Sequence, residues 1–216
     1  MDGSSLERLT MDPAYDDQAS WSPDGKSIVF VSTRTSGTTD IWTLDLETKA
    51  ARNVTTAPGG DFRPSWSPDG EWIAFGSDRD TRIERNAPEW EHLHRVSIYV
   101  IHPDGRGLRR VTDGTRFAGS PRWSPDGKRI VCYELDVRDT HNAREDDRQP
   151  HVVSQIVSFD MATGARREHT SGVGLKVSPQ FLDADRIGYL MKAGPDPGIA
   201  YTTGSRAPWT IGGVFA

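Results

Sequence analysis

The chain has 216 residues, of which 35% are hydrophobic and 26% are charged, and its formal net charge is −5. This composition supplies enough apolar residues for a packed core and excludes a disordered chain. The negative net charge gives no reason to expect a clustered Lys and Arg surface of the kind that binds a phosphate backbone. We therefore expect no nucleic-acid partner.

No stretch reaches the ~18 consecutive apolar residues of a membrane helix, so we expect no membrane insertion. Residues 1–10 lack the apolar core of a signal peptide. We therefore assign no cellular compartment from the sequence. The bacterial periplasm is expected only if the chain is an N-terminally truncated fragment. Cys132 is the only cysteine. This excludes an intrachain disulfide, and the apolar run Ile130–Tyr133 around it predicts a buried thiol.

The pentapeptide Trp-Ser-Pro-Asp-Gly occurs three times, at residues 21–25, 66–70 and 123–127. Proline presets φ, aspartate bonds its own backbone and glycine accepts a positive φ, so each copy predicts a hairpin turn. We expect the aspartates of the three copies to form turns and not to act as general acids. An apolar, strand-like run follows each turn, at residues 28–31, 72–75 and 130–133.

Each unit continues with a third apolar strand and a short fourth strand that ends in threonine. Four antiparallel strands in roughly 45 residues are typical of a β-propeller blade. We therefore predict an all-β protein, one β-propeller domain over residues 1–216 built from four-stranded antiparallel blades. In chain order the units are the last strand of a blade (1–10), three complete blades (17–56, 62–113 and 119–170) and an incomplete blade (177–204).

The partial units at the two ends allow two shapes. Either the chain is an open arc of a larger propeller, or the N-terminal strand completes the last blade and four blades close into a ring. We favour the open arc because residues 209–216 fit no repeat position. The repeated tryptophans Trp21, Trp66 and Trp123 are expected to pack between blades.

The second unit resembles the TolB-type propeller repeat family, a WD40-like repeat. The residues that carry the resemblance are Pro64–Gly70, Ile73–Phe75, Ile98–Val100 and Arg109–Thr112. The resemblance covers most of the chain. It implies a six- or seven-bladed body, often extracytoplasmic in bacteria, that serves as a protein-binding platform or as the propeller part of a larger enzyme. The chain contains no Gly-x-Ser-x-Gly elbow of a serine peptidase.

Two long insertions, residues 79–95 and 136–151, join the second and third strands of neighbouring blades, so we expect them side by side on one face. Loops on a rigid scaffold concentrate recognition residues. We therefore expect a protein partner or a small ligand to bind there. Arginines suit carboxylate or phosphate groups, and Trp90 suits either a partner contact or a cover over its own loop. The candidate binding residues are Arg79, Arg82, Arg85, Trp90, His92, His94, His141 and His151.

The function expected from these features is that of a non-enzymatic protein- or ligand-binding scaffold, with no catalytic residue, cofactor or metal ligand assigned. An alternative is a metal-dependent, lyase-like propeller enzyme in which the loop histidines His92, His94, His141 and His151 hold a divalent metal. A second alternative is an accessory propeller domain of a larger hydrolase. The insertions also fit a third interpretation, solvated polar loops without a site.

Overall fold

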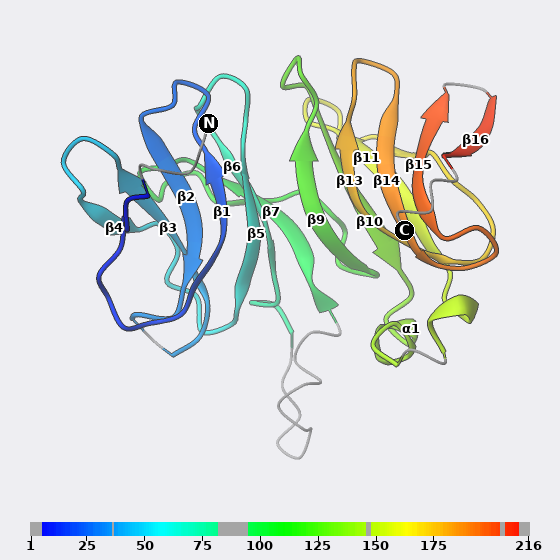
Figure 1. Cartoon of the computed structure of the whole chain (residues 1–216), viewed down its shortest axis with the longest axis horizontal. Coiled ribbons are helices and arrows are strands. Elements are labelled where there is room, and N and C mark those ends of the chain that lie inside the picture. Colours follow the sequence, from blue (N-terminus) through cyan, green and yellow to red (C-terminus); the bar gives the residue numbers. More distant parts are fainter. Residues whose placement is uncertain (1–5, 36, 82–94, 146–147, 204–205, 212–216) are drawn as a thin grey trace.

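The structure, a computed structural model, describes residues 6–35, 37–81, 95–145, 148–203 and 206–211, with side chains up to Thr202. The chain forms four antiparallel four-stranded sheets that fan out side by side (Figure 1). The first two sheets contain β1 (Asp16–Trp21), β2 (Ser27–Ser32), β3 (Asp40–Asp45) and β4 (Ala51–Asn53), then β5 (Asp61–Trp66), β6 (Ile73–Ser77), β7 (Ser97–Ile101) and β8 (Arg109–Arg110). The last two contain β9 (Phe117–Trp123), β10 (Arg129–Leu135), β11 (Ser154–Asp160) and β12 (Arg166–Glu168), then β13 (Leu175–Phe181), β14 (Ile187–Ala193), β15 (Gly198–Thr203) and β16 (Arg206–Ile211).

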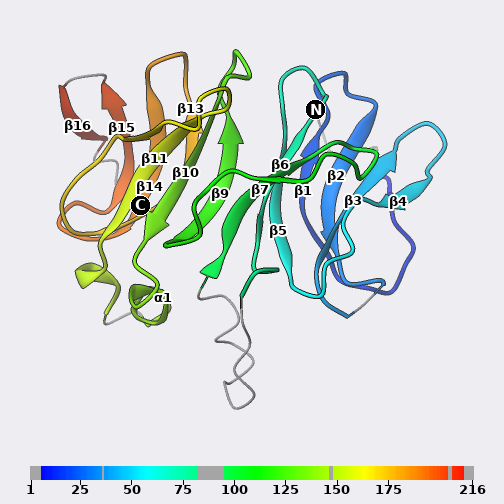
Figure 2. The same ribbon diagram turned by 180° about the vertical axis from the view of Figure 1, so that it is seen from behind.

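The predicted propeller class is confirmed. The apolar runs after the three repeated turns lie in β2, β6 and β10, which belong to three separate sheets. The first strands of neighbouring sheets contact one another in the order β1, β5, β9, β13 and form the inner side of the fan. The first and last sheets lie at opposite ends of the fan in both views, so the described chain is an open arc, as favoured (Figures 1 and 2).

The structure differs from the prediction at both ends of the chain. β16 pairs with β15, with Trp209 opposite Tyr201, so the fourth blade has four strands and extends to Ile211. Residues 6–10, the described part of the predicted N-terminal strand, form no strand. Leu9 instead packs against the outer side of the first sheet. That side carries the buried apolar side chains of Ile28, Phe30 and Leu44, and Leu9 takes part in covering them.

The Trp-Ser-Pro-Asp-Gly turns form as predicted. In the first copy the Ser22 hydroxyl donates to the Asp24 carboxylate at 2.6 Å, and the same carboxylate accepts from the Lys26 amide at 3.0 Å. The glycine closes the turn with a positive φ of 71°. These hydrogen bonds lower the pKa of Asp24 and hold its carboxylate in the turn. The other copies repeat the network at Ser67, Asp69, Glu71 and Gly70, and at Ser124, Asp126, Lys128 and Gly127.

The core lies between the sheets. Each interface joins the apolar side chains of one blade to those of the next: Val29, Val31 and Ile41 with Ile73 and Phe75, then Ile98 and Val100 with Ile130 and Val157, then Val131 and Ile156 with Ile187 and Tyr189. Trp66 and Trp123 pack against the first and second interfaces, as predicted. Trp21 differs, with 63% of its surface exposed, because no sheet precedes it in the described chain.

Cys132 is completely buried inside the second interface. Burial raises the pKa of its thiol well above the ordinary value, so the side chain behaves as a small apolar group, as predicted. Among the described residues, no helix has the length and apolar character needed to cross a lipid bilayer.

Candidate functional site

Each inner strand carries a β-bulge at the same repeat position, three residues before the aromatic residue that ends the strand. The residue at this position has a positive φ in all four blades, between 52° and 56°, and none of the four is glycine. Non-glycine residues seldom adopt this conformation, and bulges often re-aim a side chain next to a functional site. The four bulge residues are Gln18, Arg63, Ser120 and Ser178.

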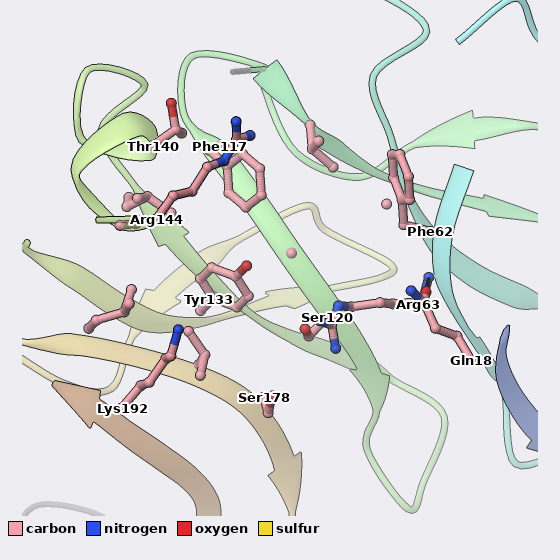
Figure 3. Close-up of a pocket in the computed structure, with 17 residues that line it drawn as sticks. Gln18, Phe62, Arg63, Phe117, Ser120, Tyr133, Thr140, Arg144, Ser178 and Lys192 are labelled. Carbon is pink, nitrogen blue, oxygen red and sulfur yellow. Dashed lines mark hydrogen bonds between the residues drawn. The ribbon is translucent and has the colours of Figure 1, made fainter. Parts of the chain in front are cut away.

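All four bulge residues line one cavity of about 380 Å³, which we call the central pocket (Figure 3). The pocket receives side chains from all four blades, and its volume is sufficient for a small organic ligand. Its described lining consists of Gln18, Phe62, Arg63, Gly76, Val96, Phe117, Gly119, Ser120, Tyr133, Leu135, Thr140, Ala143, Arg144, Leu175, Val177, Ser178 and Lys192.

The aromatic part of the lining comes from Phe62, Phe117 and Tyr133. The rings of Phe117 and Tyr133 lie 5.8 Å apart between centroids. The Tyr133 ring fits because position 119 is glycine: a Cβ atom on Gly119 would stand 2.9 Å from the ring and its hydroxyl. Figure 3 shows Tyr133 facing the middle of the pocket. Glycine at position 119 therefore leaves the space that the phenol of Tyr133 occupies in the pocket wall.

The charged groups of the described lining are all cationic: Arg63, Arg144 and Lys192. Arg63 reaches in from one side, and Arg144 and Lys192 from the other (Figure 3). All three residues are exposed. Burial raises the pKa of Tyr133, and the positive charge of Arg63 opposes that rise. The phenol thus lies within the electrostatic reach of the arginine.

The bulges of the first two blades are joined by a hydrogen bond. The Arg63 backbone amide donates to the side-chain oxygen of Gln18 at 2.6 Å. The carboxylate of Asp17 lies nearby but does not line the pocket. Its pKa is lowered first by the hydrogen bond from Tyr15, and the charge of Arg63 adds a smaller contribution. The hydrogen bond fixes the backbone at Arg63, and the bulge sets the direction of the Arg63 side chain.

The insertion between β10 and β11 contributes one end of the pocket. It contains α1 (Asp139–Asn142) and the 3₁₀ turn η2 (Gln149–His151). Thr140, Ala143 and Arg144 from this insertion line the pocket. The predicted binding residues His141 and His151 do not: His141 lies on α1 beside Thr140, and His151 is exposed on η2. The insertion was identified from the sequence, but the pocket-lining positions within it were not.

The insertion between β6 and β7 is described only in part. The predicted binding residues Arg82, Arg85, Trp90, His92 and His94 lie outside the described residues.

Arg79, the remaining predicted binding residue, lies inside the second blade. Its guanidinium pairs with both carboxylate oxygens of Asp61 at 3.0 Å and lies over the ring of Tyr99, 4.9 Å from the centroid. The first blade repeats this arrangement with Arg34, which pairs with Asp16 at 2.8 Å. Because the same contact recurs in two blades, the geometry gives Arg79 a structural role.

No group of three or more His, Cys, Asp or Glu side chains suited to hold a metal ion occurs in the described part of the chain. The two histidines outside the insertions have local partners. The His102 ring stacks on Trp72 with centroids 3.7 Å apart. The His169 Nε2 atom and the Ser158 hydroxyl share a hydrogen bond of 2.8 Å.

A sequence signal for the pocket exists in the repeat itself. The position three residues before the aromatic residue holds Gln, Arg, Ser or Ser, and proline follows it in three of the four units. A polar residue inside an otherwise apolar strand points to a bulge or a special orientation. Our sequence interpretation concentrated on the long insertions and did not use this position.

No protein-family model matches the chain. Over 106 residues it is 28% identical to the Tol-Pal system protein TolB of Nitratidesulfovibrio vulgaris, a match that covers 49% of this chain and 21% of that protein. A stretch of 37 residues is 49% identical to dipeptidyl-peptidase 5 of Porphyromonas endodontalis and covers 17% of this chain and 5% of that protein. The matched stretches thus span about a fifth or less of either relative.

Solved propeller structures are similar over most of the chain. A putative TolB from Agrobacterium tumefaciens has a TM-score of 0.56 at 27% identity, over 74% of this chain and 50% of that one. TolB from Acinetobacter baumannii has a TM-score of 0.69 at 21% identity, over 95% and 45%. An oligogalacturonate lyase in complex with manganese has a TM-score of 0.70 at 16% identity, over 94% and 55%. The fold is therefore a β-propeller similar to that of TolB, and a solved enzyme shares this fold.

Proposed function

We propose that this chain is a non-enzymatic binding scaffold, and that it holds a small ligand or a segment of a protein partner in the central pocket and on the adjoining insertion face. One observation carries the proposal: four strained bulge residues, one from each blade, face a single cavity to which the 136–151 insertion adds Thr140 and Arg144. Strain of this kind is stored where function needs a fixed geometry.

The scaffold supports such a site because its walls are rigid. Strands hydrogen-bonded into four sheets hold the lining residues of the blades, while the insertion supplies the variable part. Pockets with apolar walls and a few converging polar groups are the usual form of a small-molecule site. The similarity to TolB, which is named as a protein of the Tol-Pal system, supports a role in binding.

The experiment is a ligand-observed NMR screen with a library of neutral and charged fragments. Ala143 lines the pocket and is half-buried, so Ala143→Trp fills the cavity; Ala162, exposed on the turn after β11, gives the matched control Ala162→Trp. Fragments that bind the wild type should lose binding to the first variant and keep binding to the second. A screen in which binding survives Ala143→Trp, or in which no fragment binds, contradicts the proposal.

A separate measurement addresses the non-enzymatic character. Elemental analysis of the purified chain, with and without a chelator, should find no stoichiometric metal. A bound metal that disappears on replacing His92 and His94 by alanine would favour the metal-dependent alternative.

A further inference from the structure

We propose that the central pocket is selective for organic anions, and that the ligand is a small organic acid whose carboxylate or phosphate group is bound by Arg63 and attracted by the positive charges of Arg144 and Lys192 on the facing side. This inference rests on the proposed function, because it names the ligand class of the same pocket.

The charge of the lining carries the inference. The chain as a whole is acidic, with 31 Asp and Glu against 26 Lys and Arg. The described lining nevertheless contains three cationic side chains, and neither Asp nor Glu is among its seventeen residues. The composition of the whole chain would favour a lining with more acidic than basic side chains. Clefts lined by one sign of charge concentrate ligands of the other sign.

The pocket arginine on the β5 bulge differs from three other arginines of the blades. Arg34, Arg79 and Arg166 each form an ion pair with a carboxylate of the chain. Within the described residues, neither Arg63 nor Lys192 forms such a pair. A guanidinium presents a planar fork of donors that fits the two oxygens of a carboxylate or phosphate. Arg63 is therefore available for a ligand.

The backbone directs this arginine toward the cavity. Arg63 occupies the strained bulge position at φ 52°, and the Gln18 side chain fixes its amide. An extended residue at the same place would direct its side chain elsewhere, since side chains alternate across a strand. The bulge thus orients a cationic side chain toward the ligand.

The rest of the lining indicates the body of the ligand. Three aromatic rings and the apolar side chains of Leu135, Leu175 and Val177 also line the pocket. Apolar walls of this kind bind hydrocarbon or ring surface. The combination fits an acid with an apolar or aromatic body better than it fits an inorganic ion.

The test pairs charged probes with neutral ones: benzoate with benzamide, which has nearly the same shape, and phenyl phosphate with phenol, which lacks the phosphate group. Affinities are measured by isothermal titration calorimetry or NMR titration on the full chain. We expect benzoate and phenyl phosphate to bind at least about tenfold more tightly than their neutral partners, and their affinity to fall as salt is raised, because salt screens exposed charges.

Variants assign the effect to the pocket. Arg63→Gln should weaken benzoate binding by about tenfold, which is the scale of one charge-assisted hydrogen bond, and Lys192→Gln should weaken it by a smaller factor because the pocket loses positive charge. Lys26→Gln, on an exposed turn outside the pocket, is the matched control and should leave binding unchanged. Circular dichroism and the urea midpoint of each variant show that it is folded.

The outcomes separate this inference from the proposed function. If neutral fragments bind in the pocket but benzoate and benzamide bind equally, the anion inference is wrong and the scaffold proposal stands. If benzoate binding survives Arg63→Gln and Lys192→Gln in folded protein, the anion site lies elsewhere and the inference also fails. If neither charged nor neutral probes enter the pocket, both proposals fail.

Discussion

Replacing Asp61 by alanine should destabilise the chain more than the same change at Asp16. The two carboxylates occupy equivalent positions, and each pairs with an arginine eighteen residues later. The Asp61 side chain is 0% exposed and that of Asp16 19%, while their partners Arg79 and Arg34 are similarly buried, at 13% and 11% exposed. Removing one member of a buried pair leaves the other charge uncompensated, at a cost of about 3–5 kcal/mol.

We therefore expect Asp61→Ala to lower the free energy of unfolding by about 3 kcal/mol, the lower end of that range because Arg79 retains some contact with water. Asp16→Ala should cost less, about 1–2 kcal/mol, since water reaches the Asp16 carboxylate and screens part of that pair. Urea denaturation followed by tryptophan fluorescence measures both. Arg79→Met keeps the aliphatic stem of the side chain and removes its charge.

Two results would refute this reasoning. One is an equal loss for Asp61→Ala and Asp16→Ala. The other is additivity of Asp61→Ala and Arg79→Met in the double variant, because residues that form one ion pair should be coupled. If Arg79 acts in binding and not in the blade, Arg79→Met should weaken ligand binding while leaving the unfolding midpoint in place.

Three further predictions concern single residues. Arg63→Gln should raise the pKa of Tyr133 further, since the arginine opposes the effect of burial; absorbance titration, taken as the difference from Tyr133→Phe, should show the rise, and a fall would count against the placement of the guanidinium. Gly119→Ala should cost about 1–3 kcal/mol of stability and weaken benzoate binding, because its Cβ atom would stand 2.9 Å from the Tyr133 ring; unchanged binding and stability would mean that the ring moves freely. Burial lowers the pKa of His169 from 6.5 to about 4. Between these pH values the unfolded chain binds a proton on this histidine that the folded chain does not bind. The free energy of unfolding should therefore fall as pH drops from 6.5 toward 4, by about 1 kcal/mol per pH unit. Urea midpoints for the wild type and His169→Asn measure this slope, which should flatten in the variant; identical slopes would contradict the assignment.

The fold could be predicted from the sequence because the turns that mark each repeat unit are determined by neighbouring residues. A Trp-Ser-Pro-Asp-Gly turn is specified by its own residues: Ser22 and Asp24 hydrogen-bond within the turn, and the glycine alone accepts the required φ. Apolar runs of strand length then follow at a constant distance. The ends of the chain were harder, because Leu9 and the strand β16 depend on what they pack against and not on a repeat motif.

The site was predicted only in part because it depends on three-dimensional convergence. Arg63, Ser120 and Ser178 lie far apart in the sequence and meet only when the inner strands line up around one cavity. The insertion at 136–151 was recognised from its length, yet Arg144 was not, because sequence alone does not show which part of a loop faces the pocket. Arg79 looked like a loop residue because its buried partner, Asp61, precedes it by eighteen positions.

A crystal structure of the chain grown with benzoate tests the central claim most directly. The account predicts the ligand in the central pocket, with its ring against Tyr133 and its carboxylate at about 3 Å from the guanidinium of Arg63. Benzoate bound only outside the pocket, or bound within it with the carboxylate turned toward Leu175 and Val177, would contradict the account.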